Sequence, residues 1–347
     1  MIQYSGDRNQ FDSETSDADT NYTGLKVSVT NESGTNDKDF NVDFADALVA
    51  GLATDAKSIP CRFLYDKRGS ELFEQITDLH EYYPTRTETS ILRGFSAEFA
   101  RAAGAEVALV EFGSGSSTKT ELLLDSLGSK AKVYVAVEIS QAALDAALNR
   151  IQDRFPELST VGICDDFNRG ITLPANIKQH SLVGFFPGST IGNLERTESI
   201  QLLIAMRETL GDQATLIVGT DLVKSPGLLI PAYDDARGVT AEFTRNILLH
   251  ANYAVGTDFC VDAFQHQVIW NESQQRIEIY LVSLHEQSVN LLGRTIKLHR
   301  RERIHIENSH KYTIEGFRAL AKHAGWKTKD IWTDQHEWFA VHELTAN

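Results

Sequence analysis

The stretch Val107-Ala-Leu-Val-Glu-Phe112, followed by Gly113-Ser-Gly115-Ser-Ser-Thr118, decides the fold class. A short, mostly apolar run that ends in a Gly-x-Gly turn predicts a buried strand, and residues 119–127 behind it have the pattern of a helix. Glycines let the backbone approach a ligand closely, and a helix N-terminus presents unpaired N–H groups. We therefore expect a strand–loop–helix unit whose loop can hold a ligand.

The same alternation of strand and helix continues along the chain as far as Asp221. Strand-like runs occupy residues 133–137, 159–164, 181–186 and 214–220, and helical patterns occupy residues 141–155 and 195–210. Strands that alternate with helices predict a parallel sheet covered on both faces. We therefore assign the α/β class, with a doubly wound sheet.

Beyond Asp221 the pattern changes. Three runs of alternating polarity, at residues 266–270, 276–284 and 301–306, indicate a half-solvated antiparallel sheet. A helical pattern at 312–324 and a strand-like run at 337–344 follow. The sequence thus predicts a β-rich insertion that interrupts the α/β domain before its last helix and strand.

Residues 1–40 differ from the rest of the chain in composition. They are rich in Ser, Thr, Asn, Asp and Gly, and they hold eight acidic residues against three basic ones, which is five of the fifteen net negative charges. Such a segment has little apolar surface to bury, so we predict a disordered acidic tail.

The overall composition restricts the class of protein. A chain of 347 residues with 42% hydrophobic residues can bury the cores of about two domains. The net charge of −15 argues against a nucleic-acid partner, because phosphate binding needs clustered Lys and Arg. No apolar run reaches the roughly 18 residues of a membrane span, and we expect no signal peptide. Three widely spaced cysteines fit neither a disulfide framework nor a zinc site, so we expect a cytoplasmic protein.

Two acidic positions at later strand ends suggest which ligand the glycine loop holds. Glu138 ends the second strand, where a carboxylate can bind ribose hydroxyls, and Asp166-Phe167 follows the third, where a ring can face an adenine. Position 118 is Thr rather than the third glycine of a dinucleotide fingerprint, and there is no Walker lysine pattern. The loop by itself could be a tight turn without a ligand. Together the three features favour S-adenosylmethionine over NAD or ATP.

Several blocks, in this order, resemble the L-histidine Nα-methyltransferases of ergothioneine biosynthesis, from about Pro60 to Thr345. Those blocks are Leu64-Tyr-Asp-Lys-Arg-Gly-Ser70-x-Leu-Phe73, Glu81-Tyr-Tyr-Pro-Thr-Arg-Thr-Glu88, Phe112-Gly-Ser-Gly-Ser-Ser-Thr-Lys-Thr120, Pro187-Gly-Ser-Thr-Ile-Gly-Asn-Leu194, Gly219-Thr-Asp-Leu-Val-Lys224, Ala232-Tyr-Asp-Asp235 and Phe264-x-His266-x-x-x-x-Trp270-Asn271. Ordered blocks of this length are far more specific than the loop alone.

The resemblance implies a class I methyltransferase domain with a separate, β-rich substrate domain built from the N-terminal part and the insertion. The boundaries that follow are a tail at 1–40, the substrate domain at 41–85 and 223–310, and the methyltransferase core at 86–222 and 311–347. The family moves three methyl groups in turn from S-adenosylmethionine to the α-amine of histidine, which gives hercynine. We expect a monomer whose partners are L-histidine and its methylated intermediates, with no nucleic acid or membrane.

The resemblance also assigns site residues. The methyl donor is expected at Gly113, Ser114, Gly115, Lys119, Glu138, Asp166, Phe167 and Gly188. Histidine is expected at Tyr82, Asn193, Tyr233, Ile279, Glu307, Asn308 and Ser309, where Ile279 forms an apolar wall. One departure concerns the ribose carboxylate, which is commonly Asp in the family and is Glu138 here. Glutamate can still bind a diol.

Glu307 and Ser309 carry the argument for histidine. In a regular strand residues two apart face the same side, so Arg303, His305, Glu307 and Ser309 are expected to share a face. A carboxylate beside a hydroxyl can bracket the two nitrogens of an imidazole. Spacing alone favours a solvated glutamate in a turn, and the resemblance reverses that interpretation.

The catalytic roles are assigned to Tyr65 and Asn193. Asn193 can hold the amino acid's carboxylate or amine, and a water path past Tyr65 or Tyr82 can remove the protons of successive methylations. The eleven histidines show no metal-ligand spacing, and we expect no metal. Two alternatives remain: a family member that acts on another amine, such as one derived from tryptophan, and a regulatory protein that binds the methyl donor without catalysis.

Overall fold

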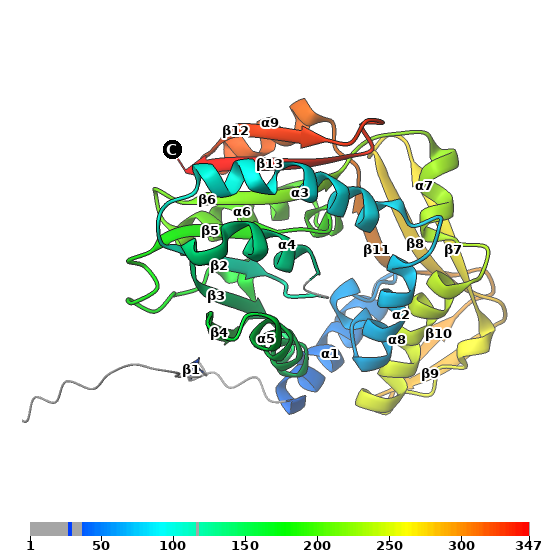
Figure 1. The fold of residues 1–347 in the computed structure, drawn as a ribbon. Helices are drawn as coiled ribbons and strands as arrows, with labels where there is room; N and C mark the ends of the chain where they lie inside the picture. Colours follow the sequence, from blue (N-terminus) through cyan, green and yellow to red (C-terminus); the bar gives the residue numbers. More distant parts are fainter. Residues whose placement is uncertain (1–26, 30–36, 116–117, 347) are drawn as a thin grey trace, which may run out of the picture.

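The computed structural model describes residues 27–29, 37–115 and 118–346, and its centre is an eight-stranded sheet (Figure 1). The strand order is β1-β4-β3-β2-β5-β6-β13-β12, and the strands from β1 to β6 run parallel. β13 is antiparallel to both of its neighbours. The strands are β1 Val27–Val29, β2 Val107–Phe112, β3 Ala131–Glu138, β4 Ser159–Cys164, β5 Ser181–Phe186, β6 Thr215–Asp221, β12 Trp326–Thr333 and β13 Phe339–Ala346.

Helices cover both faces of this sheet, and alternate residues of each strand pack against opposite layers. Val107 and Leu109 of β2 belong to the core under α3, α4 and α5, whereas Ala108 and Val110 belong to the core under α6 and α9. These helices are α3 Tyr83–Ala102, α4 Thr118–Leu127, α5 Gln141–Arg154, α6 Arg196–Leu210 and α9 Ile314–His323. The predicted doubly wound sheet is confirmed. Its order reverses between β2 and β5, which is where such sheets bind ligands.

A second body packs beside the carboxyl ends of the parallel strands (Figure 1). Its single core joins Phe44 and Phe63 of the N-terminal part to Phe243, Ile277 and Ile304 of the insertion. The predicted β-rich domain, made of an N-terminal part and an insertion, is therefore confirmed. Its elements are α1 Asp37–Leu52, α2 Lys67–Thr77, α7 Pro226–Tyr233, α8 Val239–Val255, the sheet β11-β8-β7 (Arg303–His310, Arg276–Ser283, Phe264–Asn271) and the hairpin of β9 Gln287–Leu291 and β10 Arg294–Leu298.

The insertion leaves and re-enters the sheet domain at one point. The Tyr312 N–H donates to the Asp221 carbonyl at 2.9 Å, and the Val223 N–H donates to the Tyr312 carbonyl at 2.9 Å. Strand β6 therefore ends beside the residues that close the insertion. Side chains at the two ends of the insertion lie next to the carboxyl edge of the sheet.

Several elements were absent from the sequence prediction. These are α3, the β9–β10 hairpin, β12 and the short edge strand β1. Of the predicted tail, residues 1–26 and 30–36 lie outside the described residues, while β1 pairs with β4 and α1 begins at Asp37. The 20-residue helix α3 starts with Pro84 in its first turn, a favourable position, and it buries Ile91, Leu92 and Phe95 at helical spacing.

The prediction that Arg303, His305, Glu307 and Ser309 share one face is wrong. His305 pairs with Tyr280 and Glu307 pairs with Ile279, so Ile306 is an extra residue that forms a β-bulge. The bulge reverses the alternation. Glu307 and Ser309 face the core of the second domain together with Ile279, and His305 lies on the opposite face.

We predict that Gly192→Ala lowers the free energy of unfolding by about 1–3 kcal/mol, as overpacking usually does. Gly192 lies in the 3-10 turn η4 (Thr190–Asn193), and a Cβ there would lie 2.8 Å from the His310 carbonyl of β11. Urea denaturation measures the change. Gly94→Ala is the control, since its Cβ meets nothing within 4 Å on α3, and it should stabilise by about 0.5–1 kcal/mol. Equal stability of the Gly192 variant and the parent would contradict this packing.

Candidate active site

The loop after β2 has the geometry of a ligand-binding turn. Gly113 takes a φ of 79°, in the region that favours glycine, and its N–H donates to the Val137 carbonyl of β3 at 2.8 Å. The Ser114 hydroxyl is buried and has no hydrogen-bond partner among the described residues. A Cβ on Gly115 would meet nothing within 4 Å. A buried hydroxyl without a partner, next to a glycine with room for a side chain, fits a loop that is completed by a ligand.

The acidic residues predicted to bind the donor lie at the neighbouring strand ends. Glu138 ends β3 and accepts hydrogen bonds from the N–H groups of Ile139 and Ser140 at 2.9 and 3.3 Å. Burial raises its pKa to about 7, although these backbone bonds oppose the rise. Asp166 caps the turn η3 (Phe167–Arg169) by accepting from the Asn168 N–H at 3.0 Å. The sheet edge thus carries both carboxylates, as the sequence predicted.

Phe167 closes the same edge with an aromatic surface. Its ring lies edge-on to Phe112 and Phe186, with centroids 6.2 and 5.9 Å away. A Cβ on Gly113 would lie 3.7 Å from the Phe167 ring. The glycine loop and this ring are therefore adjacent.

Lys119 and Gly188 meet at a buried carboxylate that the sequence analysis did not single out. Glu88 of α3 is fully buried, pairs with the Lys119 ammonium at 2.5 Å and accepts from the Gly188 N–H at 2.9 Å. A Cβ at Gly219 would overlap the same carboxylate. Glu88 therefore joins α3, α4 and the loop after β5, and it occupies the ammonium that was expected to contact the methyl donor.

A second group of predicted residues surrounds Glu307. The side chain of Asn193, at the end of η4, hydrogen-bonds to the Glu307 carboxylate. Burial raises the pKa of Glu307 to about 7, while the Lys311 charge and the Asn193 amide act to lower it. Ile279 stands opposite Glu307 in the sheet and is 2% exposed. Glu307 is thus a buried carboxylate at the boundary between the two domains.

Three tyrosines face this carboxylate. Burial raises the pKa of Tyr65, Tyr82 and Tyr233 well above the usual 10, and the negative charge of Glu307 adds to the rise in each case. The rings of Tyr82 and Tyr233 lie edge to face, with centroids 6.1 Å apart. Tyr65 is 38% exposed as a whole residue, while its hydroxyl is surrounded by protein. All three hydroxyls therefore stay protonated at neutral pH.

Asn308, also predicted to bind the substrate, is not brought to this group. It lies on the opposite face of β11, where its carbonyl oxygen is 2.8 Å from Nε2 of His305. Its amide donates to Glu195 at 3.1 Å, and Glu195 also pairs with Arg276 at 2.6 Å. Asn308 thus ties the start of α6 to the second domain behind the site.

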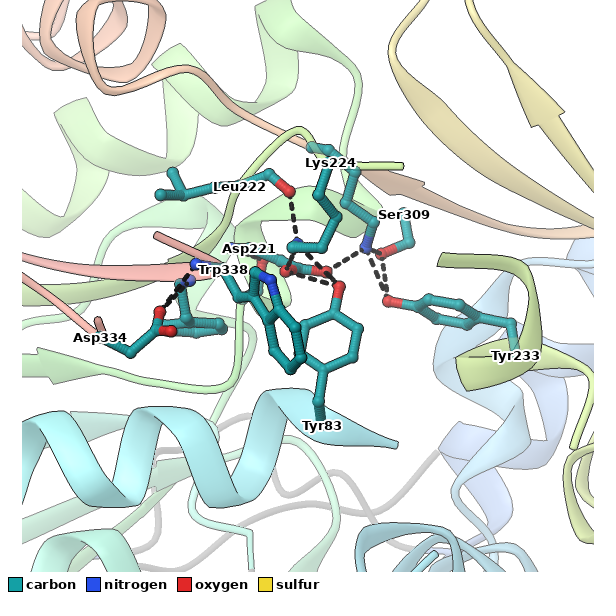
Figure 2. Close-up of polar contacts among 11 residues, drawn as sticks. Tyr83, Asp221, Leu222, Lys224, Tyr233, Ser309, Asp334 and Trp338 are labelled. Carbon is teal, nitrogen blue, oxygen red and sulfur yellow. Dashed lines mark hydrogen bonds and ion pairs between the residues drawn. The ribbon is translucent and has the colours of Figure 1, made fainter. Parts of the chain in front are cut away.

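A buried ionic cluster lies beside Ser309 and Tyr233 (Figure 2). The Ser309 and Tyr233 hydroxyls are 2.9 Å apart, and the Lys311 ammonium donates to each of them at 2.7 Å. Lys311 also pairs at 2.8 Å with Asp221, which accepts from the Tyr83 hydroxyl.

Lys224 is the second cation on Asp221, and it donates to the Tyr83 hydroxyl as well. Burial acts to raise the pKa of Asp221, but the two ammonium groups hold it below its usual value. Burial in turn lowers the pKa of Lys224 to about 8. Asp221 and Lys224 lie in the block Gly219–Lys224 that resembles the family, but the sequence predicted no role for them, and no sequence signal pointed to Lys311.

The strand order, the antiparallel β13 and the glycine loop at the point of reversal define a class I methyltransferase. Within residues 27–29, 37–115 and 118–346, no three His, Cys, Asp or Glu side chains are grouped as metal ligands. No helix in the same part of the chain is long and apolar enough to cross a membrane.

Comparison with known proteins identifies the family. The model of the family described as histidine-specific methyltransferase, SAM-dependent, matches residues 44–346, and the chain belongs to this family. Histidine N-alpha-methyltransferase of Mycolicibacterium smegmatis is 39% identical over 82% of this chain and 89% of that protein. Ergothioneine biosynthesis protein 1 of Neurospora crassa is 29% identical over 84% of this chain and 33% of that protein.

Among solved structures, a S-adenosylmethionine-dependent methyltransferase from Clostridium acetobutylicum has a TM-score of 0.46. It is 12% identical, and the match covers 80% of this chain and 98% of that chain.

We predict that Glu307 makes the stability of the protein depend on pH. Its pKa is about 7 in the folded protein against a usual 4.5, so between these values the folded state binds more protons than the unfolded state. Stability from this carboxyl therefore falls as the pH rises through that window. Glu307→Gln removes the dependence, and it should gain up to about 3 kcal/mol on the parent between about pH 4.5 and 7.

Urea denaturation of both proteins across this pH range measures the difference in their free energies of unfolding. Glu138 also has a raised pKa, but both proteins contain it, so its contribution cancels in the difference. A stability difference that stays constant with pH would contradict the buried state of Glu307.

Proposed function

We propose that the protein transfers three methyl groups in turn from S-adenosylmethionine to the α-amine of L-histidine. The product is hercynine, and the reaction is the first step of ergothioneine biosynthesis. The observation that carries the proposal is the buried Glu307 carboxylate beside Ser309. Its charge contributes to the raised pKa values of Tyr65, Tyr82 and Tyr233. Membership of a histidine-specific family and the names of the relatives support the same substrate.

The glycine loop and the strand ends fit the methyl donor. The Ser114 hydroxyl lacks a partner among the residues described, and the space beside Gly115 is open. Glu138 and Asp166 would hold the ribose and adenosine polar groups, and Phe167 would face the base. When bound, S-adenosylmethionine supplies the electrophilic methyl group. Because the Lys119 ammonium is already paired with Glu88, any contact of Lys119 with the donor is made alongside that ion pair.

Asn193 is oriented by its bond to Glu307. A carboxylate can only accept hydrogen bonds, so Asn193 presents its NH₂ group to Glu307 and its carbonyl oxygen is left for another donor. An amine N–H of the substrate is such a donor. This contact would aim the amine at the donor edge of the sheet, and ideal alignment of two reactants supplies up to about 7–11 kcal/mol.

The rest of the pocket would hold the imidazole and the carboxylate of histidine. Glu307 accepts an imidazole N–H, and the Ser309 hydroxyl pairs with the other nitrogen. Tyr82 and Tyr233 remain protonated, and they can donate to the substrate carboxylate. An indole has a single N–H and no second ring nitrogen, so in this place it would leave either Glu307 or Ser309 without a ring partner, which is costly. We therefore favour histidine over an amine derived from tryptophan.

Tyr65 would help the methylated amine to lose its protons, but not by acting as a strong base itself. Each further methylation requires that the methylated amine lose a proton before the next attack. The raised pKa of Tyr65 keeps its hydroxyl protonated, so it cannot remove that proton directly at neutral pH. We propose that the Tyr65 hydroxyl, on a side chain that is partly exposed, orders a water path from the amine to solvent.

The proposal includes three further features. Methyl transfer from a sulfonium has a good leaving group and requires no metal ion. We propose a cytoplasmic enzyme, since three widely spaced cysteines, Cys61, Cys164 and Cys260, give no disulfide framework. We also propose that it acts as a monomer, because both ligand regions are built from one chain.

The experiment for the function is mass spectrometry of the purified protein with S-adenosylmethionine and an equimolar mixture of the twenty amino acids. We predict that only histidine gains the mass of three CH₂ groups. Glu307→Ala should lose this selectivity and leave histidine among the weak substrates, because a site that pairs buried polar groups discriminates by up to about 10⁴–10⁵. Methylation of another amino acid in the parent, with histidine unchanged, would overturn the proposal.

We predict that Tyr65→Phe lowers kcat by up to about 10²-fold while the Kd for histidine stays nearly unchanged. The phenyl ring keeps the packing against Phe73 and Phe243, whose ring centroids are both 5.5 Å away, but it cannot order water. Stopped-flow turnover and calorimetric binding separate the two quantities. Tyr253→Phe is the control, since Tyr253 is 93% exposed on α8. Unchanged turnover of the Tyr65 variant would exclude the water path.

A further inference from the structure

Lys311 lies directly behind the two hydroxyls of the histidine pocket. It follows β11, its side chain is fully buried, and its ammonium has three partners: Asp221 at 2.8 Å, Tyr233 at 2.7 Å and Ser309 at 2.7 Å. The ammonium also lies 4.7 Å from the centre of the Tyr233 ring. A buried lysine is costly unless it is paired, and here every one of its three protons has an acceptor.

Counting donors shows what this ammonium does to the hydroxyls. A lysine ammonium only donates, so Tyr233 and Ser309 must both accept from it. Each hydroxyl has one proton, and one of the two protons is used in the bond between them. The pair therefore has a single proton left for a ligand.

We propose that Lys311 is a positioning residue of the histidine pocket, because its ammonium fixes the hydroxyl directions of Tyr233 and Ser309 against the bound amino acid. The inference rests on the proposed function and deepens it. With Tyr233 donating to the substrate carboxylate, Ser309 gives its proton to Tyr233 and keeps a lone pair for an imidazole N–H. Glu307 accepts the other ring N–H, so the three side chains together specify a carboxylate and an imidazolium ring, the form in which both ring nitrogens donate.

The matched control is Lys224, the other lysine on Asp221. It donates to Asp221, to the Tyr83 hydroxyl and to the Leu222 carbonyl, and it contacts neither Tyr233 nor Ser309. Lys311→Met and Lys224→Met therefore each remove one buried positive charge from the same carboxylate. Only the first releases the two hydroxyls of the pocket.

The experiment measures initial rates of the purified parent and both variants with L-histidine and S-adenosylmethionine. We expect Lys311→Met to raise the KM for histidine by about 10- to 100-fold, since charge-assisted hydrogen bonds to both hydroxyls are lost. The KM for S-adenosylmethionine should change less than about twofold. Both variants should have lower thermal stability than the parent, because each removes a buried positive charge from Asp221. The KM of Lys224→Met for histidine should stay within about threefold of the parent.

An equal change in the histidine KM in both lysine variants, or none in Lys311→Met, would show that Lys311 is merely structural and overturn the inference. Tyr233→Phe gives a second test: combined with Lys311→Met it should raise the KM by much less than the product of the single effects. Multiplicative effects would contradict the inference. Lys311→Gln replaces Lys311→Met if the latter does not fold. A parent that leaves histidine unmodified refutes the proposed function itself, before any variant is compared.

Discussion

The buried ion pair between Asp221 and Lys311 is the interaction on which the arrangement of this protein depends. Asp221 ends the last parallel strand of the sheet, and Lys311 ends the inserted segment, so their contact joins the two domains where the chain crosses between them. Removing one partner of a buried pair leaves an uncompensated charge, which typically costs about 3–5 kcal/mol. Backbone hydrogen bonds between Asp221, Tyr312 and Val223 strengthen the same junction between the domains. The ion pair also holds Ser309 of β11 in place through the Lys311 ammonium.

The same crossing explains how one chain brings two ligands together. The glycine loop, Glu138 and Asp166 lie at the ends of β2, β3 and β4, as a reversal of strand order requires. Asn193 extends from the loop after β5 to Glu307 of the insertion, so a side chain of the sheet domain is bonded to the carboxylate that we propose binds the imidazole. Burial raises the pKa of Glu307 to about 7 although the Lys311 charge opposes the rise, which marks Glu307 as a group that binding can use.

Much of the fold followed from the sequence, because alternating strands and helices leave a strong periodic signal. The strands at 159–164 and 181–186 have the predicted bounds. The sequence did not predict which residues of β11 share a face, because the β-bulge at Ile306 depends on pairing with β8 and leaves no local sequence pattern. Asn308, which was assigned to the histidine site with the resemblance, lies on the face of β11 opposite Glu307 and Ser309. Glu88 and Lys311 were missed for a related reason: a buried charge is recognised by its partners, and those are 31 and 90 residues away in Lys119 and Asp221.

The most direct test of the account is a crystal structure of the protein with L-histidine and S-adenosylhomocysteine. The account predicts that the imidazole nitrogens lie about 3 Å from the Glu307 carboxylate and the Ser309 hydroxyl. It also predicts that the α-amine lies beside the Asn193 carbonyl oxygen and faces the glycine loop. An imidazole bound elsewhere, with Glu307 contacting only Asn193 and its protein neighbours, would contradict the account.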